Sequence, residues 1–486
     1  MEILFPVTEI SPYAKVGGLA DVAAALPKAL RQLGHAVTVV LPHYPGLDEH
    51  GLLLARRLSP LSVAIAGKTH SLAVYGTRLS SQVDAVFLDA PGLLDRPEVY
   101  GDAAGDYPDN AQRFALFSKA IATLALEWAE AGKNVDIVHC HDWPTALVPF
   151  FVREAFAARP ELKAPKTVLT VHNAAYQGQF EKAILPELGI DWKEFSVDGI
   201  EFYDKINLLK FGILRADAVT TVSETYAREI QDAPHGASLE GVFKQRKSAL
   251  TGIVNGVDYS VWNPAVDPNI VARYDAEDVT NKGRCKGAIQ DELQLQLDPT
   301  APLISFVGRL VAQKGADLIA AALPKLLRST EAQFAILGEG PDEIVETLIA
   351  AVAKSHGRAT FVRGAQEGLA HRVYAASDFV LVPSRFEPCG LVQLYAQRYG
   401  ALPVVHATGG LVDTVVDCDA QLETGTGFTF DEPTPEALIS AVQRGVAARS
   451  HGRWNALVRR VMRLDRGWER PARRYEQLYR QVVRGA

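Results

Sequence analysis

The sequence predicts an α/β protein with two doubly wound, parallel β-sheets. Short apolar runs rich in β-branched residues recur along the chain, and segments with apolar residues at helical spacing follow them. Strands that alternate with helices in this way are typical of a parallel sheet covered by helices on both faces. A polar stretch from residue 263 to about 278 interrupts the alternation. We therefore expect one sheet domain in residues 1–262 and a second in residues 263–466.

Length and composition exclude several classes of protein. The chain has 486 residues, of which 48% are hydrophobic and 22% charged, so it is an ordinary globular protein with ample material for two cores. A net charge of −7 argues against a nucleic-acid binder that relies on bulk charge. Since no segment is apolar and long enough to span a bilayer, we expect no membrane partner.

The cysteines and the first residues bear on location. The four cysteines lie far apart and show no C-x-x-C spacing, which favours a reducing compartment over a disulfide framework. The first residues already have the pattern of a strand, without a basic leader or a Ser- and Arg-rich transit peptide. We expect a cytoplasmic protein; a plastid protein whose transit peptide has been removed is the alternative.

The turn at Gly17 and Gly18 is the first candidate site. Residues 2–9 are apolar and of strand length, and residues 19–33 show one apolar helical face. A helix that opens between them offers unpaired backbone N–H groups and the positive end of its dipole, a combination that binds phosphate. Lys15 adds a positive charge. An ordinary turn with a solvated lysine is the alternative, and the G-x-G-x-x-G dinucleotide spacing is absent.

Residues 34–42 have the pattern of a second parallel strand. The alternating runs at 62–66, 71–75 and 85–88 predict antiparallel strands inserted at a sheet edge. A polar loop at residues 100–110, rich in glycine and aromatic residues, then leads into a helix. The residues alone leave open whether this loop is merely solvated or is a mobile loop that binds sugar hydroxyls.

Polar residues follow two buried strands of the first half. His139, His141 and Asp142 end one strand, and His172 and Asn173 end the next. Ligands gather at the carboxyl ends of strands in open parallel sheets. The first three residues are metal ligands by type, but further ligands at a useful spacing are missing, so we predict no metal site. We expect Asp142 to orient the end of the next strand instead.

The second half begins with an apolar strand at 303–308, which Arg309, Lys314 and a helix follow. Both cations flank a strand-to-helix turn, so both could point at one anion: arginine grips phosphate oxygens bidentately and lysine acts as a point charge. Two solvated surface cations are the alternative. Further apolar strands are expected at residues 333–337, 360–362, 379–382 and 402–405.

Two more glycine-bearing turns precede helices in this half. Residues 383–391 open a helix at 392–398, with Glu387 one turn before it. Residues 408–411 open another helix, with Asp413 in its first turn. Three such helix starts, combined with Arg, Lys and Glu on one sheet edge, are far more specific than any one of them.

Together these motifs resemble the signatures of one family. Residues 15–19 (K-V-G-G-L) are similar to the N-terminal signature of bacterial glycogen synthases and plant starch synthases, and residues 139–143 resemble their H-x-H-D-W motif. Residues 308–315 (G-R-x-x-x-x-K-G) resemble the diphosphate-binding segment of GT-B transferases. Because the motifs run in family order from about residue 2 to 480, the chain is identified as a member of this family of retaining glycosyltransferases, GT5.

The resemblance implies the GT-B fold, in which two Rossmann-like domains face a central cleft. Residues 1–262 would form the acceptor-side, starch synthase catalytic domain, and residues 263–466 would bind the nucleotide sugar. The C-terminal helix, residues 467–486, would cross back onto the first domain. A basic amphipathic helix that binds a partner is the alternative for this segment.

The resemblance also implies the reaction. Glucose would move from ADP-glucose to the non-reducing 4-OH end of an α-1,4-glucan with retention of configuration (EC 2.4.1.21), as in glycogen biosynthesis. The partners would be ADP-glucose and a glycogen or malto-oligosaccharide acceptor, with no cofactor; the oligomeric state stays open. The implied catalytic residues are His172, Arg309, Lys314 and Glu387. The implied substrate-binding residues are Lys15, Gly17, Gly18, Asp21, Tyr100, Asn110, Asp142, Asn173, Asn255, Cys389, Gly390, Leu391, Thr408, Gly409 and Gly410.

Three rival functions remain. One is another GT-B transferase that uses UDP-glucose or a small acceptor, such as a sucrose- or trehalose-forming enzyme. The second is an α-glucan phosphorylase, which shares the fold and needs pyridoxal phosphate. The third is a non-catalytic glucan-binding scaffold, against which the completeness of the implied catalytic set argues.

Overall fold

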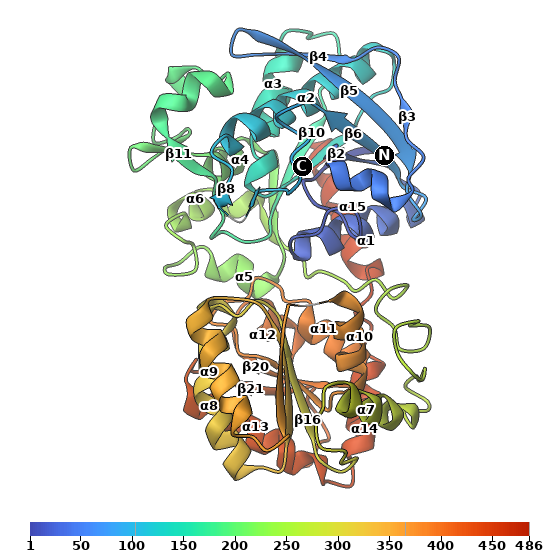
Figure 1. The fold of residues 1–486 in the computed structure, drawn as a ribbon. Coiled ribbons are helices and arrows are strands. Elements are labelled where there is room, and N and C mark those ends of the chain that lie inside the picture. The colour runs from blue at the N-terminus through green and yellow to red at the C-terminus, as the bar shows by residue number, and fades with distance from the viewer. Residues whose placement is uncertain (103, 365, 486) are drawn as a thin grey trace. The chain divides into compact units, whose positions relative to one another are not determined.

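The computed structural model describes residues 1–102, 104–364 and 366–485. The chain divides into two compact units, which we describe separately (Figure 1): unit 1 comprises Met1–Gly256 and Trp468–Ala486, and unit 2 comprises Val257–Gly467. The boundary lies ahead of the expected 262–263 because Trp262 belongs to the core of unit 2, where its ring stacks on those of His371 and Tyr395.

Unit 1 is built on a mixed sheet with a parallel centre. Its strands lie in the order β15 (Leu250–Gly252), β14 (Ala218–Thr221), β10 (Lys166–Val171), β9 (Ile137–His141), β1 (Glu2–Pro6), β2 (Ala36–Pro42), β6 (Asp84–Asp89), β5 (Lys68–Arg78) and β3 (Ala55–Arg56), with β4 (Leu61–Ile65) beside β5. Two small sheets accompany it: β11 (Gln179–Glu181), β13 (Lys205–Asn207) and β12 (Glu201–Phe202), and β7 (Gly101–Asp102) with β8 (Gly105–Asp106).

The antiparallel strands expected between residues 62 and 88 are only partly correct. β3, β4 and β6 do pair antiparallel with β5. However, β6 also pairs parallel with β2, so residues 85–88 belong to the parallel part of the sheet. The chain between β2 and β6 is long enough for the crossover that a parallel pair requires.

Alternate residues of the central strands face two cores. Ile3 and Phe5 face a core that includes residues of α1 (Gly18–Gln32) and α15 (Glu469–Arg484), and Figure 1 shows the red α15 close to the blue α1. Leu4 faces the other core. That core includes residues of α2 (Asn110–Glu130), α3 (Val148–Ala157), α4 (Leu208–Arg215), α5 (Glu224–Glu229) and α6 (Glu240–Gln245). Short 3-10 helices lie at η1 (Pro45–His50), η2 (Trp143–Thr145), η3 (Lys182–Leu188), η4 (Trp192–Glu194) and η5 (Lys247–Ala249).

Unit 2 contains a parallel sheet in the order β18 (Ala359–Arg363), β17 (Gln333–Gly338), β16 (Leu303–Val307), β19 (Phe379–Val382), β20 (Leu402–His406) and β21 (Phe428–Phe430). The strands expected in this half are confirmed. The accompanying helices are η6 (Ala312–Lys314), α7 (Asn281–Glu292), α8 (Ala316–Ser329), α9 (Asp342–Ala353), α10 (Glu367–Ala376), α11 (Val392–Arg398), α12 (Gly410–Thr414), α13 (Pro435–Arg449) and α14 (Trp454–Met462). The predicted fold class, two doubly wound parallel-sheet domains, is therefore confirmed.

Among the described residues, none of the helices combines the length and the apolar character that a bilayer crossing requires.

Candidate active site

Asp142 connects the ends of two neighbouring strands of unit 1. It follows β9, and its Oδ1 atom accepts a 2.7 Å hydrogen bond from the backbone N–H of His172, which follows β10. The N–H of Asn173 also donates to this carboxylate. Asp142 thus fixes the course of the chain beyond β10, which is the orienting role expected for it. Burial raises the pKa of Asp142 to about 7, and the nearby Glu9 carboxylate adds to the rise.

Replacing Asp142 with asparagine should change the pH dependence of stability. The unfolded chain loses the Asp142 proton near the ordinary pKa of about 3.9, whereas the folded chain loses it near a pKa of about 7. The wild-type free energy of unfolding should therefore fall by up to about 1.4 kcal/mol per pH unit as the pH rises through this window. Asparagine does not titrate, and its amide oxygen can still accept from the His172 N–H.

Urea denaturation of both proteins in pH steps measures this effect. The stability of the variant relative to wild type should increase with pH inside the window and level off above the folded pKa. Taking the difference cancels the other groups that titrate there. A difference that does not vary with pH would contradict the raised pKa of Asp142.

Three neutral histidines lie in β9 or just after β10. The Nε2 atom of His172 is 3.0 Å from Nδ1 of His141. Burial lowers the pKa of His172 to about 3 and holds the pKa values of His139 and His141 well below the usual histidine range. Both ring nitrogens of His139 are engaged, by Tyr479 and Thr170. Within the described ranges, no group of three or more His, Cys, Asp and Glu side chains could hold a metal ion.

The glycine turn begins α1 as expected, but two of its amides serve the protein itself. Gly17 is the N-cap residue, and Gly18 is the first residue of α1. The N–H groups of Val16 and Gly17 donate to Oε2 of Glu9 at 2.9 and 2.7 Å. The expectation that the Gly17 amide is unpaired is therefore wrong, because a carboxylate of the preceding loop accepts from it.

The side chains beside this turn include one paired lysine. Nζ of Lys15 lies 2.8 Å from Oδ1 of Asp21 in the first turn of α1. Both side chains are partly exposed, so this ion pair is weak and can open for a ligand. Two of the residues implied by the resemblance are therefore brought together at the start of α1.

Glu9 is the residue that the sequence analysis missed at this turn. Its side chain is buried, and besides the two amides it accepts a 2.7 Å hydrogen bond from the hydroxyl of Tyr100 at Oε1. The Tyr100 hydroxyl also lies 2.8 Å from Oγ1 of Thr8. The only sequence signal for Glu9 is a carboxylate at the end of an apolar strand.

Tyr100 and Asn110, at the two ends of the polar loop, are held by hydrogen bonds. The backbone carbonyl of Tyr100 accepts from Nδ2 of Asn110 at 2.7 Å, and Oδ1 of Asn110 accepts from the buried guanidinium of Arg113. Asn110 itself is buried. The exposed part of this loop is the β7–β8 hairpin, in which Ala103 lies outside the described residues. Both ends of the loop are thus tied to the rest of unit 1, and its mobility and its binding of sugar hydroxyls stay predictions.

Asn173 and Asn255 lie beyond β10 and β15. Oδ1 of Asn173 accepts from the N–H of Ala175 at 3.0 Å. Asn255 is buried, and its Oδ1 atom has no hydrogen-bond partner among the described residues. A buried acceptor without a partner is costly, so Asn255 is suited to bind a ligand hydroxyl.

In unit 2, Lys314 and Glu387 form an ion pair. Nζ of Lys314 is 2.6 Å from Oε2 of Glu387, and the hydroxyl of Ser384 donates to the same oxygen at 2.9 Å. Glu387 is buried, whereas Lys314 is partly exposed at the end of η6. Arg309 is exposed and follows β16 after Gly308. The structure therefore brings Lys314 and Glu387 together, as residues of one site should be.

The turn before α12 packs directly on the turn that carries Glu387. The N–H of Gly410 donates to the carbonyl of Glu387 at 3.0 Å. A Cβ atom on Gly410 would lie 2.3 Å from the carbonyl oxygen of the buried Cys389, so only glycine fits. Thr408 is also buried at this turn. The expected third helix is short, since α12 spans Gly410–Thr414 only.

Glycine is required at two further positions of these turns. Gly390 has a φ of +73° and Gly409 a φ of +48°, which L side chains rarely adopt. Leu391 is the N-cap residue of α11, and Gly409 is that of α12. The residues expected to bind substrate in unit 2 therefore share two adjoining helix starts.

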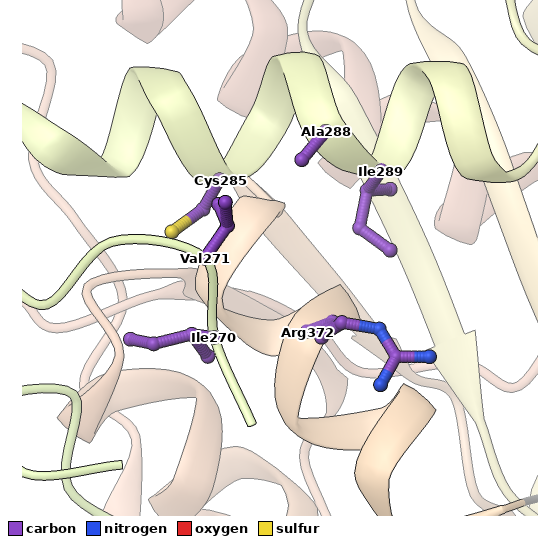
Figure 2. Close-up of a pocket in the computed structure, with 6 residues that line it drawn as sticks. All are labelled: Ile270, Val271, Cys285, Ala288, Ile289 and Arg372. Carbon is purple, nitrogen blue, oxygen red and sulfur yellow. The ribbon is translucent and has the colours of Figure 1, made fainter. Parts of the chain in front are cut away.

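A separate apolar pocket of unit 2 is not this site. It is a small hollow that is partly open to solvent, and Figure 2 shows its side chains. The lining residues are Ile270, Val271, Cys285, Ala288, Ile289 and Arg372. None of the expected site residues lines it, and among its lining side chains only Arg372 is charged.

Comparisons with known proteins agree over the whole chain. The family described as starch synthase catalytic domain matches residues 2–245, and the family described as glycosyl transferases group 1 matches residues 290–451. A glycogen synthase of Anaeromyxobacter sp. (strain Fw109-5) is 45% identical, with 99% of this chain and 100% of the relative covered. Glycogen synthase 2 of Geobacter metallireducens is 42% identical, with 99% and 98% covered.

Solved structures extend the agreement to the fold. The catalytic domain of starch synthase IV from Arabidopsis thaliana, bound to ADP and acarbose, is 33% identical over 99% of each chain, with a TM-score of 0.91. A sucrose-phosphate synthase of Thermosynechococcus elongatus, at 19% identity over the whole of both chains and a TM-score of 0.61, shares the fold alone. With both family matches, full-length relatives above 40% identity and the same two parallel sheets, the chain belongs to the glycogen and starch synthase family, GT5, of GT-B glycosyltransferases.

Proposed function

We propose that the chain elongates an α-1,4-glucan by transferring glucose from ADP-glucose to the non-reducing 4-OH end, with retention of configuration, in glycogen biosynthesis. The observation that carries the proposal is the Lys314–Glu387 pair, in which an ammonium and a buried carboxylate meet at 2.6 Å beside two glycine-bearing helix starts. The glycogen synthases that match over their full length support it, as does the related starch synthase that binds ADP and acarbose.

Residues of unit 2 bind the diphosphate and the sugar of the donor. Arg309 and Lys314 supply positive charge to the departing diphosphate, which needs stabilisation as its bond to the sugar breaks. Glu387 accepts hydrogen bonds from glucose hydroxyls and holds the ammonium of Lys314 in place. The backbone around Cys389, Gly390 and Leu391 lies close enough to Glu387 in sequence to bind the same sugar.

The residues of unit 1 provide further sugar contacts and a third cation. Lys15 and the amide of Gly18 bind the diphosphate at the start of α1. His172, fixed by Asp142, contacts the donor sugar. Asp21 and Asn255 bind acceptor hydroxyls, for which the Oδ1 atom of Asn255 needs a donor.

The transfer proceeds by front-face attack. The bond between the anomeric carbon and the diphosphate oxygen breaks, and the bond from that carbon to the acceptor O4 forms on the same face. The proton of the acceptor hydroxyl passes to an oxygen of the departing diphosphate. Glu387 is held by Lys314 and Ser384 and acts on charge and orientation rather than as a nucleophile.

The test is transfer of labelled glucose into glycogen, with ADP-glucose and UDP-glucose measured side by side. Strong transfer from ADP-glucose is expected. Transfer from UDP-glucose alone would keep the family and overturn the proposed donor. Glycogen binding without transfer from either donor would favour a glucan-binding scaffold.

A cytoplasmic location is part of the proposal. The four cysteines are buried and form no disulfide within the described part of the chain. Buried, reduced cysteines suit a reducing compartment.

Treatment with EDTA should leave the transfer rate unchanged. Arg309, Lys314 and Lys15 are three cations for the diphosphate, so the proposed reaction needs no divalent ion to offset its charge. The measurement is glucose transfer after dialysis against EDTA, with a buffer-dialysed sample as the control. Loss of activity that Mg²⁺ restores would contradict this part of the proposal.

A further inference from the structure

The C-terminal helix α15 contributes a buried tyrosine to the strand ends that carry His172. Tyr479 has no exposed surface, and its hydroxyl lies 2.7 Å from Nδ1 of His139 in β9. On the other side of the ring, Nε2 of His139 lies 2.7 Å from Oγ1 of Thr170 in β10. Tyr479 and Thr170 therefore hold His139 at both nitrogens.

Burial determines where the proton of His139 lies. Among the described residues, His139 is the only recorded hydrogen-bond partner of the Tyr479 hydroxyl, and a buried O–H that donates to nothing is costly. The Tyr479 hydroxyl therefore donates to Nδ1. Neutral histidine carries a single N–H, so His139 is protonated on Nε2 and donates to Thr170. The Thr170 hydroxyl can in turn donate its hydrogen bond to Oγ1 of Thr220, 2.5 Å away.

The pair formed by His141 and His172 can be assigned by the same reasoning. Nδ1 of His141 is 3.0 Å from Nε2 of His172, while the buried Nε2 atom of His141 has no hydrogen-bond partner among the described residues. An orphaned buried N–H is rarer and costlier than an orphaned acceptor. His141 is therefore protonated on Nδ1 and donates to His172, which leaves the N–H of His172 on its own Nδ1.

The two histidine pairs are packed against each other. The ring centroids of His139 and His141 are 4.3 Å apart, and the ring of Phe5 lies 4.3 Å from His141 and 5.0 Å from His139. Among the described residues, the ring of His141 makes one hydrogen bond, so its orientation depends on these neighbours. Fixing His139 thus restricts the ring that donates to His172.

We propose that Tyr479 is a positioning residue for His172: by fixing His139 it holds His141, and His141 keeps the N–H of His172 on Nδ1. The contact of that N–H with the sugar rests on the proposed function. The tyrosine lies 340 residues from His139 in sequence, so the last helix of the chain takes part in setting a residue at the carboxyl end of β10.

The Tyr479→Phe variant tests this with two measurements. The first is the ¹⁵N NMR spectrum of the imidazoles without substrate, with signals assigned by single His→Gln replacements. Wild type should show His139 protonated on Nε2 and both His141 and His172 on Nδ1. In Tyr479→Phe the His141 and His172 signals should move toward a mixture of the two tautomers. The second is kinetics, where kcat for glucose transfer should fall about two- to tenfold, the effect of losing one net hydrogen bond.

Tyr274→Phe is the matched control. Tyr274 is also buried, and its hydroxyl donates to the carbonyls of Ala375 and Tyr399 in unit 2. Its loss should lower stability to a similar degree while leaving the imidazole spectrum and kcat unchanged. Thr170→Val removes the second partner of His139, so it should change the spectrum in the same direction as Tyr479→Phe. This second variant tests the proposal if Tyr479→Phe folds poorly.

A His141 protonated on Nε2 in wild type would overturn the proposal, and so would a Tyr479→Phe protein with wild-type spectrum and wild-type kcat. The spectrum separates this proposal from the proposed function, because it is measured without substrate. A wild-type protein that shows the three expected tautomers but transfers glucose from neither donor would overturn the proposed function and support the proton arrangement.

Discussion

Replacing Lys314 with alanine should lower kcat for glucose transfer by about 10²–10³-fold, the usual loss for one donor aimed at transition-state charge. The ammonium of Lys314 lies 2.6 Å from Glu387 at the turn before α8, and we assign it to the departing diphosphate. Charge on the leaving group grows as the sugar bond breaks, so the KM for the donor should change less than kcat. Steady-state kinetics with ADP-glucose at saturating glycogen measure both constants.

Lys325→Ala is the matched control for this variant. Lys325 is an exposed lysine of α8, the helix that follows Lys314. Its replacement with alanine changes the net charge of the protein by the same amount as Lys314→Ala. Its kcat should stay near wild type. Lys314→Ala also leaves Glu387 with Ser384 as its side-chain partner among the described residues, so a thermal melt should accompany the kinetics. Equal kcat values for the two lysine variants would remove Lys314 from the site.

The fold was predictable because it depends on local periodicity. Strands such as residues 303–307 and 379–382 are buried on both faces, and continuous apolar runs reveal such strands. The helix after Gly17 shows one apolar face, which packs on the sheet of unit 1. The one misassigned strand, β6, pairs with neighbours of both directions, and its short alternating pattern could not distinguish them.

The candidate site was predictable as a set of strand ends and glycine turns, and less so as a set of contacts. The helix after Gly17 was expected to begin with unpaired amides, but the Gly17 amide donates to Glu9; at the other turn, the Gly410 amide donates to the carbonyl of Glu387. A sequence shows which N–H groups lie at a helix start; it does not show which acceptor the fold brings to them.

The contacts that the sequence could not reveal join residues far apart in the chain. Glu9 meets Tyr100 across 91 residues, and His139 meets Tyr479 across 340. No local pattern marks such a pair, because each residue by itself fits an ordinary strand end or an amphipathic helix face. Burial then favours these contacts strongly, since a polar group without a partner is costly once water is removed.

Replacing Glu9 with alanine should lower kcat/KM for the donor on the order of 10²-fold. The Glu9 carboxylate accepts from the amides of Val16 and Gly17 and from the Tyr100 hydroxyl, and each hydrogen bond to a charged group contributes about 1.5–3 kcal/mol. Without these hydrogen bonds, the turn that presents Lys15 and the start of α1 is no longer fixed. Part of the binding free energy of ADP-glucose must then be spent on ordering this turn. Kinetics with ADP-glucose measure the loss, and hydrogen exchange at the amides of Val16 and Gly17 measures directly whether the turn is still ordered.

Glu9→Gln and Glu2→Gln separate positioning from charge. Glutamine can turn its oxygen toward the two amides and its NH₂ toward the Tyr100 hydroxyl, which can accept from it and donate to Thr8. Because glutamine keeps the hydrogen bonds that link the turn to Tyr100, Glu9→Gln should retain most of the activity that Glu9→Ala loses. It should also retain most of the protection of the two amides against hydrogen exchange. Glu2→Gln makes the same charge change at the opposite end of β1, where Glu2 pairs with Lys133, and should leave donor kinetics near wild type. If Glu9→Gln were as impaired as Glu9→Ala while the two amides stayed protected from exchange, the reaction would depend on the negative charge of Glu9. Its hydrogen bonds to the turn would then not explain the loss of activity.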